Sequence, residues 1–240
     1  MIYKSITIYL FQRRVDGGYR LRNHSQHLRR IFGQTNLPHV IVKYFLRQQQ
    51  PKCRWRISDD FWDSWDALFE QFGRLERWNP YRIPGCWPDA DMLPLGVLQL
   101  GKRSTFFTPD EQQTLMTLWS IARSPLIMGG DLRKLDGPTT ALLTNDEVLA
   151  VNQRSKDNRP LFNTGGLIAW HARAPASEAH YLALFNTLES KATVSVDLAS
   201  IRVTRPVPVR DLWARKADGI ARDRLERALP AHGSALYRLG

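Results

Sequence analysis

Acidic residues stand beside an arginine and several tryptophans in two short stretches of this chain, WRISDD and WPDADM. Their charged and aromatic members are Trp55, Arg56, Asp59, Asp60, Trp87, Asp89 and Asp91. Carboxylates accept hydrogen bonds from hydroxyl groups, and aromatic faces pack on the CH groups of a sugar ring. These residue types favour a carbohydrate site over a metal site, because the second stretch lacks both a nearby histidine and the regular ligands of a calcium loop. Ordinary turn chemistry is an equal alternative for the second stretch.

Strand alternation distinguishes the neighbouring carboxylates of the first stretch. If the strand RWRIS continues, Arg56 and Asp60 share one face while Asp59 points the other way. Functional side chains gather at the C-terminal ends of parallel strands, which favours Asp60 beside Arg56 as the functional group. The alternative is that these acids only cap the helix that follows. The same alternation puts three residues of the second stretch on one face: Trp87, Asp89 and Asp91.

Strand-like and helix-like segments alternate between these stretches and the middle of the chain. The predicted strands are 54–58, 85–93 and 125–130, and the helices predicted to follow them are 59–78, 109–124 and 137–153. The second helix has the clearest start, with Thr108 as N-cap, Pro109 in the first turn and Glu111 in the capping-box position. For the first helix Ser58 or Asp59 is the expected cap, and for the third Asp136. This order predicts parallel βαβ units of an α/β layer or barrel.

Composition and periodicity change at both ends of that α/β part. Residues 1–58 hold 12 Lys and Arg against one acid, Asp16, so they carry the whole formal charge of +11. After about residue 156 the apolar period becomes two, which predicts a small antiparallel β-sandwich. We therefore expect a basic leader at 1–52, an α/β domain at 53–155 and a sandwich at 156–240. Nucleic-acid binding is disfavoured, because no recognised fold or aromatic platform supports the basic leader.

The cysteines and the N-terminus exclude several classes of protein. Two cysteines, Cys53 and Cys86, do not form a disulfide framework, and we expect both to be free. The first apolar run is too short to span a membrane, and its arginine pair follows it rather than precedes it, which is untypical of a signal peptide. These features do not indicate a cellular compartment. We expect no membrane partner, no cofactor and no metal.

In order and spacing, the segments WRISDDFWDSW, GCWPDADMLPLG, FTPDEQQTLMTLWSIARSPLIMGGDLRKL and LLTNDEVLAVNQ resemble glycoside hydrolase family 27, the α-galactosidase and α-N-acetylgalactosaminidase family. The resemblance implies the C-terminal part of a (β/α)8 TIM barrel followed by a small antiparallel β-sandwich domain. It implies that Asp60 is the general acid/base and that Arg56 binds substrate. Its W-x-D-x-DM motif falls on Trp87, Asp89, Asp91 and Met92, with Asp91 and Met92 in the sugar pocket.

The sequence departs from that family at the nucleophile. A retaining glycosidase needs two carboxyl groups about 5–5.5 Å apart. The family places its nucleophile in a K-x-D pattern, whereas Lys43-Tyr44-Phe45 has no acid, so no nucleophile is found. We therefore expect an α-galactosidase-like retaining glycoside hydrolase that is a truncated, weak or inactive fragment, which binds an α-galactoside or related oligosaccharide and self-associates through open barrel edges. The alternative is a non-catalytic carbohydrate-binding or structural remnant.

Overall fold

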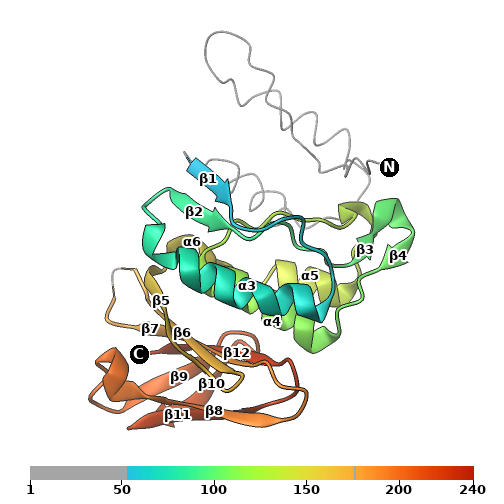
Figure 1. Cartoon of the computed structure of the whole chain (residues 1–240). Coiled ribbons are helices and arrows are strands. Elements are labelled where there is room, and N and C mark those ends of the chain that lie inside the picture. The colour runs from blue at the N-terminus through green and yellow to red at the C-terminus, as the bar shows by residue number, and fades with distance from the viewer. Residues whose placement is uncertain (1–52, 176) are drawn as a thin grey trace.

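The computed structural model describes residues 53–175 and 177–240 (Figure 1). The expected basic leader at 1–52 lies outside the described residues. The described chain forms an α/β part, which carries the candidate site, and an all-β part. Among the described helices, none is both long enough and apolar enough to cross a membrane.

Two short parallel strands carry the candidate site at their ends. β1 (Cys53–Arg56) and β2 (Cys86–Asp89) pair in register, with Arg56 opposite Asp89. The segment expected as a third strand at 125–130 makes only an isolated parallel bridge, between Leu93 and Met128. A short hairpin of β3 (Val97–Leu98) and β4 (Arg103–Ser104) follows β2.

Cys86 corrects the expectation that both cysteines are free, because it is disulfide-bonded. The backbone of Cys53 lies opposite it in the β1–β2 register. The two positions are far apart in sequence, and only strand pairing makes them neighbours.

The helices begin where their caps lie, and two of the three predicted starts are confirmed, whereas the first predicted helix begins later and the third is divided in two. The helices are α3 (Trp65–Trp78), α4 (Pro109–Ala122), α5 (Gly137–Leu143) and α6 (Asp146–Arg154), and the short 3-10 helices are η1 (Asn79–Tyr81), η2 (Gln99–Gly101), η3 (Leu132–Lys134) and η4 (Leu198–Ile201). The capping box of Thr108 and Glu111 at α4 is confirmed, as is Asp136 as the cap of α5. The third predicted helix is interrupted because Asn145 caps α6 and donates a hydrogen bond to the Leu212 carbonyl.

Helix α3 starts later than predicted, with Ser64 rather than Ser58 or Asp59 as N-cap. Tertiary contacts explain the delay. The Phe61 N–H donates to the Asp91 carboxylate, and the Asp63 carboxylate accepts from the Phe106 N–H. These long-range bonds hold the segment before Ser64 in a non-helical path.

The all-β part is a sandwich of unequal sheets, as its period of two predicts. Its strands are β5 (Lys156–Thr164), β6 (Leu167–Arg173), β7 (His180–Asn186), β8 (Ala192–Asp197), β9 (Val207–Asp211), β10 (Lys216–Ala221), β11 (Arg224–Leu229) and β12 (Ser234–Leu239). The larger sheet has the order β10-β9-β12-β7-β6-β5, and β11 pairs with β8 in a second sheet. All of these pairings are antiparallel.

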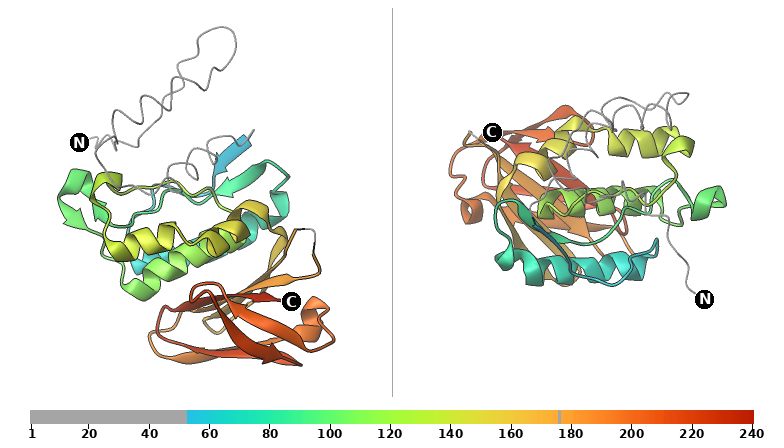
Figure 2. Two further views of the ribbon diagram at one scale, coloured as in Figure 1. Left: turned by 180° about the vertical axis from the view of Figure 1, so that it is seen from behind. Right: turned by 90° about the horizontal axis from the view of Figure 1, so that it is seen from above.

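Two apolar cores meet at the larger sheet. One face of β7 contributes Leu182 and Leu184 to a core shared with β8 and β11. The other face contributes Ala183 and Phe185 to a core shared with α3 and α4. The helices therefore lie between the parallel strands and the sandwich, as Figures 1 and 2 show. This packing ties the sandwich to the elements that position the candidate site.

Candidate functional site

The ends of β1 and β2 bring three charged residues of the two stretches together. The Arg56 guanidinium lies 3.0 Å from the Asp91 carboxylate and 3.4 Å from that of Asp60. Strand β1 ends at Arg56, so Asp60 reaches it from a loop rather than along a strand face. The Asp60 side chain is 80% exposed, whereas that of Asp91 is only 14% exposed. One arginine thus links a carboxylate open to solvent with a sheltered one.

Asp91 is fixed in place by bonds to its backbone and to its side chain. Its φ of 78° is left-handed, and its N–H donates to the Asp89 carboxylate at 3.0 Å. Its carboxylate accepts from the Phe61 N–H at 2.8 Å, and its carbonyl accepts from the Trp119 indole N–H at 3.1 Å. An acceptor held by such fixed donors is preorganised to bind a hydroxyl group.

The prediction that Trp87, Asp89 and Asp91 share one strand face is wrong for Asp91. Strand β2 ends at Asp89, and the left-handed Asp91 leaves the alternation. Asp89 is buried, and it holds the loop by accepting the Asp91 N–H. The Trp87 ring packs instead under the Arg123 guanidinium, 4.0 Å from its centroid. Direct substrate contacts of Trp87 and Asp89 stay predictions.

Met92 lies next to Gly129, in the segment that follows α4. Gly129 donates its N–H to the Leu93 carbonyl, and a side chain on Gly129 would collide with the Met92 thioether. A residue larger than glycine at position 129 would therefore have to displace the Met92 side chain. The Met92 side chain thus lies against Gly129, and the role in the sugar pocket that the resemblance implies for Met92 stays a prediction.

A second ion pair near α3 was not predicted. Arg103 donates to both oxygens of the buried Asp63 carboxylate, at 2.6 and 2.8 Å. Burial alone would raise the pKa of Asp63, but the hydrogen bonds from Arg103 and the Phe106 N–H lower it below its usual range. An acid and a base about 40 positions apart give no sequence signal of pairing. The only hint of this pair in the sequence was Asp63 itself, an acidic residue just before an apolar helix.

Within residues 53–175 and 177–240, no group of three His, Cys, Asp or Glu side chains is arranged to hold a metal ion.

Family models match two consecutive parts of the chain. Residues 36–154 match the model described as "Alpha galactosidase A", and residues 164–239 match "Alpha galactosidase C-terminal beta sandwich domain". The chain belongs to glycoside hydrolase family 27. Its α/β part is accordingly the C-terminal part of a (β/α)8 barrel, followed by the sandwich domain. The first match begins upstream of the predicted domain boundary at 53, and that boundary stays a prediction.

Family 27 proteins of known structure share this fold and part of this sequence. A GH27 β-L-arabinopyranosidase from Geobacillus stearothermophilus is 38% identical with a TM-score of 0.77, over 83% of this chain and 47% of that one. A structure titled a putative α-N-acetylgalactosaminidase from Bacillus halodurans is 36% identical with a TM-score of 0.72, over 77% of this chain and 46% of that one.

A plant relative gives the same picture. "Alpha-galactosidase 2" of Arabidopsis thaliana is 30% identical over 190 residues, which are 77% of this chain and 46% of the relative. The family 27 chain described here therefore spans about half the length of the relatives that it matches.

Proposed function

We propose that this chain carries the acid/base half of a retaining glycoside hydrolase site for terminal sugars of galactose-like configuration. The observation that supports it best is the contact of one guanidinium, that of Arg56, with the carboxylates of Asp60 and Asp91. Relatives named α-galactosidase and β-L-arabinopyranosidase point to α-galactosides or closely related pyranosides as the substrate class. Whether galactose or N-acetylgalactosamine is preferred depends on residues outside this cluster.

Asp60 and Asp91 have different environments and thus different proposed roles. Asp60 is exposed, so it can give a proton to the leaving-group oxygen and later take one from water. Asp91 is sheltered and already accepts hydrogen bonds from Arg56 and the Phe61 N–H. Such a carboxylate is suited to binding sugar hydroxyls, with Arg56 donating to a further hydroxyl and Met92 packing beside the ring.

Covalent catalysis requires another carboxylate. In retaining enzymes the nucleophile stands about 5–5.5 Å from the acid/base, on the opposite side of the scissile bond. Asp91 is committed to Arg56 and Phe61, and we assign no other carboxylate of the described residues to this role. We infer that a nucleophile would come from outside residues 53–240.

The test combines binding and turnover on the purified chain. Galactose binding, followed by ligand-observed NMR, should be lost in Asp91→Ala and retained in Asp223→Ala, which removes an exposed acid of the sandwich. Turnover of an aryl α-galactoside should be slow, and any turnover should fall by about 10²- to 10⁴-fold in Asp60→Asn. Equal galactose binding by Asp91→Ala and the parent chain would contradict the proposed sugar site. Binding without turnover would favour the non-catalytic alternative.

Self-association through the parallel strands is a further part of this proposal. Among the described strands, β1 pairs only with β2 and so has one unpaired edge. Unpaired edges attract other strands. Sedimentation velocity should therefore show a concentration-dependent dimer, and a monomer at all concentrations would count against it.

A further inference from the structure

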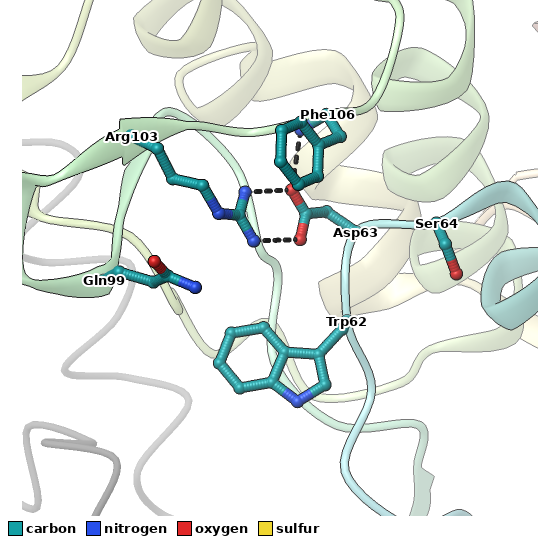
Figure 3. Close-up of a pocket in the computed structure, with 6 residues that line it drawn as sticks. All are labelled: Trp62, Asp63, Ser64, Gln99, Arg103 and Phe106. Atoms are coloured by element: carbon teal, nitrogen blue, oxygen red, sulfur yellow. Dashed lines mark hydrogen bonds and ion pairs between the residues drawn. The ribbon is translucent and has the colours of Figure 1, made fainter. Parts of the chain in front are cut away.

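A cavity near the Arg56 cluster has no part in the chemistry proposed above. Its volume is about 280 Å³, and it is lined by Trp62, Asp63, Ser64, Gln99, Arg103 and Phe106 (Figure 3). These residues come from the segment before α3 and from the segment around the β3–β4 hairpin. The volume is close to the lower end of the roughly 300–1,000 Å³ range of small-molecule pockets. The cavity thus suits a ligand about the size of one sugar ring.

The floor of this cavity is an ion pair that is held by several hydrogen bonds. Asp63, with a side chain only 2% exposed, accepts both guanidinium bonds of Arg103 and the Phe106 N–H at 2.6 Å. The guanidinium also stacks on the Phe106 ring, 4.0 Å from its centroid. The charge of Arg103 is therefore compensated, so the cavity offers hydrogen-bonding edges without favouring an anion.

An exposed indole and an amide face the same space. Figure 3 shows the Arg103–Asp63 pair between two aromatic rings, with Phe106 on one side and with Trp62 and Gln99 on the other. The Trp62 side chain is 41% exposed although it is large and apolar. An open aromatic face beside amide and guanidinium groups matches a sugar, whose CH groups pack on the ring while its hydroxyl groups bond to the polar edges.

The cavity is joined to the proposed acid/base by a short segment of chain. Burial alternates along it, because Asp60, Trp62 and Ser64 are exposed whereas Phe61 and Asp63 are buried. Asp60 and Trp62 therefore point to the same, solvent side. Their Cα atoms lie at most ~7 Å apart, since an extended chain advances ~3.3–3.6 Å per residue. Both ends of this segment are anchored, through Phe61 to Asp91 and through Asp63 to Arg103.

We propose that this cavity is a subsite for the neutral sugar on the leaving-group side of the cleaved bond. Trp62 is the platform for that sugar, and Gln99 and Arg103 are its hydrogen-bonding partners. The proposal rests on the proposed function for the identity of the first sugar, the one bound by Arg56 and Asp91. The specificity for what is attached to the terminal sugar would then lie in this chain.

The test compares two probes by saturation-transfer NMR on the full chain. Melibiose, a galactosyl-glucose disaccharide, fills both positions, and methyl α-galactoside fills only the first. Melibiose should bind roughly 3- to 10-fold more tightly, as one added aromatic contact allows. Trp62→Ala should remove this difference and the transfer to the glucose ring, with no effect on methyl α-galactoside. Tyr81→Ala, which removes an exposed aromatic side chain outside the cavity, should change neither.

The two rings report on the two proposals separately. Transfer to the glucose ring that depends on Trp62 supports the subsite. It does so even if the galactose ring gives no signal, because a missing galactose signal counts only against the proposed site of the first sugar. Transfer to the galactose ring without Trp62-dependent transfer to the glucose ring overturns the subsite and leaves the proposed function standing. An equal loss of both signals in Trp62→Ala, or no transfer to either ring in the parent chain, also overturns it.

Discussion

At the scale of single residues, the candidate site depends on pairs in which one partner is sheltered from water. Asp91 and Asp63 are both held by an arginine and by a backbone N–H. Such carboxylates are stable only with their partners, because an unpaired buried charge is costly. The exposed member, Asp60, has the freedom to exchange a proton that its proposed role needs.

Removal of the buried carboxylate Asp63 should be strongly destabilising. Asp63→Ala leaves the Arg103 guanidinium and the Phe106 N–H without their acceptor, so we expect the free energy of unfolding to fall by about 1.5–3 kcal/mol. The matched control is Glu70→Ala, which breaks the surface ion pair with Arg74 and should cost less than about 1 kcal/mol. Urea denaturation monitored by circular dichroism measures both. Similar losses for the two variants would show that Asp63 is not structurally important.

At the scale of elements, helix α4 supports both the site and the domain contact. Its residues from Thr114 to Ala122 are buried, and Trp119 donates to the Asp91 carbonyl. On the opposite side, Gln113 and Thr114 donate to carbonyls of Ser234 and His232 in the sandwich. A shift of α4 would therefore disturb the site and the domain contact together.

The capping box of α4 gives a prediction at this scale. Thr108→Ala removes the acceptor for the Glu111 N–H and should lower the free energy of unfolding by ~1 kcal/mol, within a range of about 0.5–2. Thr108→Ser keeps the acceptor and serves as the control, with a much smaller expected change. Thermal denaturation of the three proteins checks this order. An equal loss in both variants would mean that the methyl group, not the cap, matters.

Strands β6 and β7 contain a histidine pair that predicts acid sensitivity. His171 and His180 lie 2.8 Å apart between ring nitrogens. Burial, and then the neighbouring charges of His180, Arg159 and Arg173, lower the pKa of His171 to about 3. In the unfolded chain the pKa is about 6.5. The unfolded chain therefore binds the proton more readily between these values, so stability is full above about pH 6.5 and is lost as the pH falls towards 3.

The expected slope is up to ~1.4 kcal/mol per pH unit for this one proton. His171→Gln removes the contribution of this proton and should make the dependence of the urea midpoint on pH less steep between pH 4 and 6, although not flat, because burial also lowers the pKa of His180. Curves of the parent and the variant that run parallel over this range would contradict the assignment.

At the scale of the whole molecule, the barrel part and the sandwich share one of the two apolar cores, the one that contains residues of α3, α4 and β7. Phe72 of α3 and Phe185 of β7 are both buried, and their rings meet edge to face at 5.0 Å between centroids. The His232 ring stacks on Trp65 at 3.6 Å between centroids, and its nitrogens bond to Glu111 and Glu189. Continuous packing of this kind makes two domains unfold together.

We therefore expect one cooperative unfolding transition and a coupling between Phe72 and Phe185. Each Phe→Ala change should cost about 3–5 kcal/mol, and a double-mutant cycle should show a coupling of roughly 0.5–1.5 kcal/mol. A cycle between Phe72 and Leu225, which lies in the other core, is the control and should be nearly additive. Additivity of Phe72 and Phe185, or two separate transitions by calorimetry, would show that the domains unfold independently.

The sequence by itself determined the features that depend on neighbours along the chain. It predicted the α/β order, the antiparallel sandwich, the caps at Thr108 and Asp136, and the proximity of Arg56 and Asp60. Each rests on residues a few positions apart, so a local pattern is sufficient. The family resemblance added the barrel and the proposed roles.

Only the tertiary structure decided the features that depend on distant partners. The start of α3 at Trp65, the left-handed Asp91, the disulfide-bonded Cys86 and the Arg103–Asp63 pair all depend on such contacts. The Phe61 N–H meets the Asp91 carboxylate 30 positions away, and Arg103 meets Asp63 across 40. Bonds of this kind satisfy donors and acceptors that would be costly to bury without partners. Periodicity cannot reveal them, because it records which face a residue occupies but not which segment that face will meet.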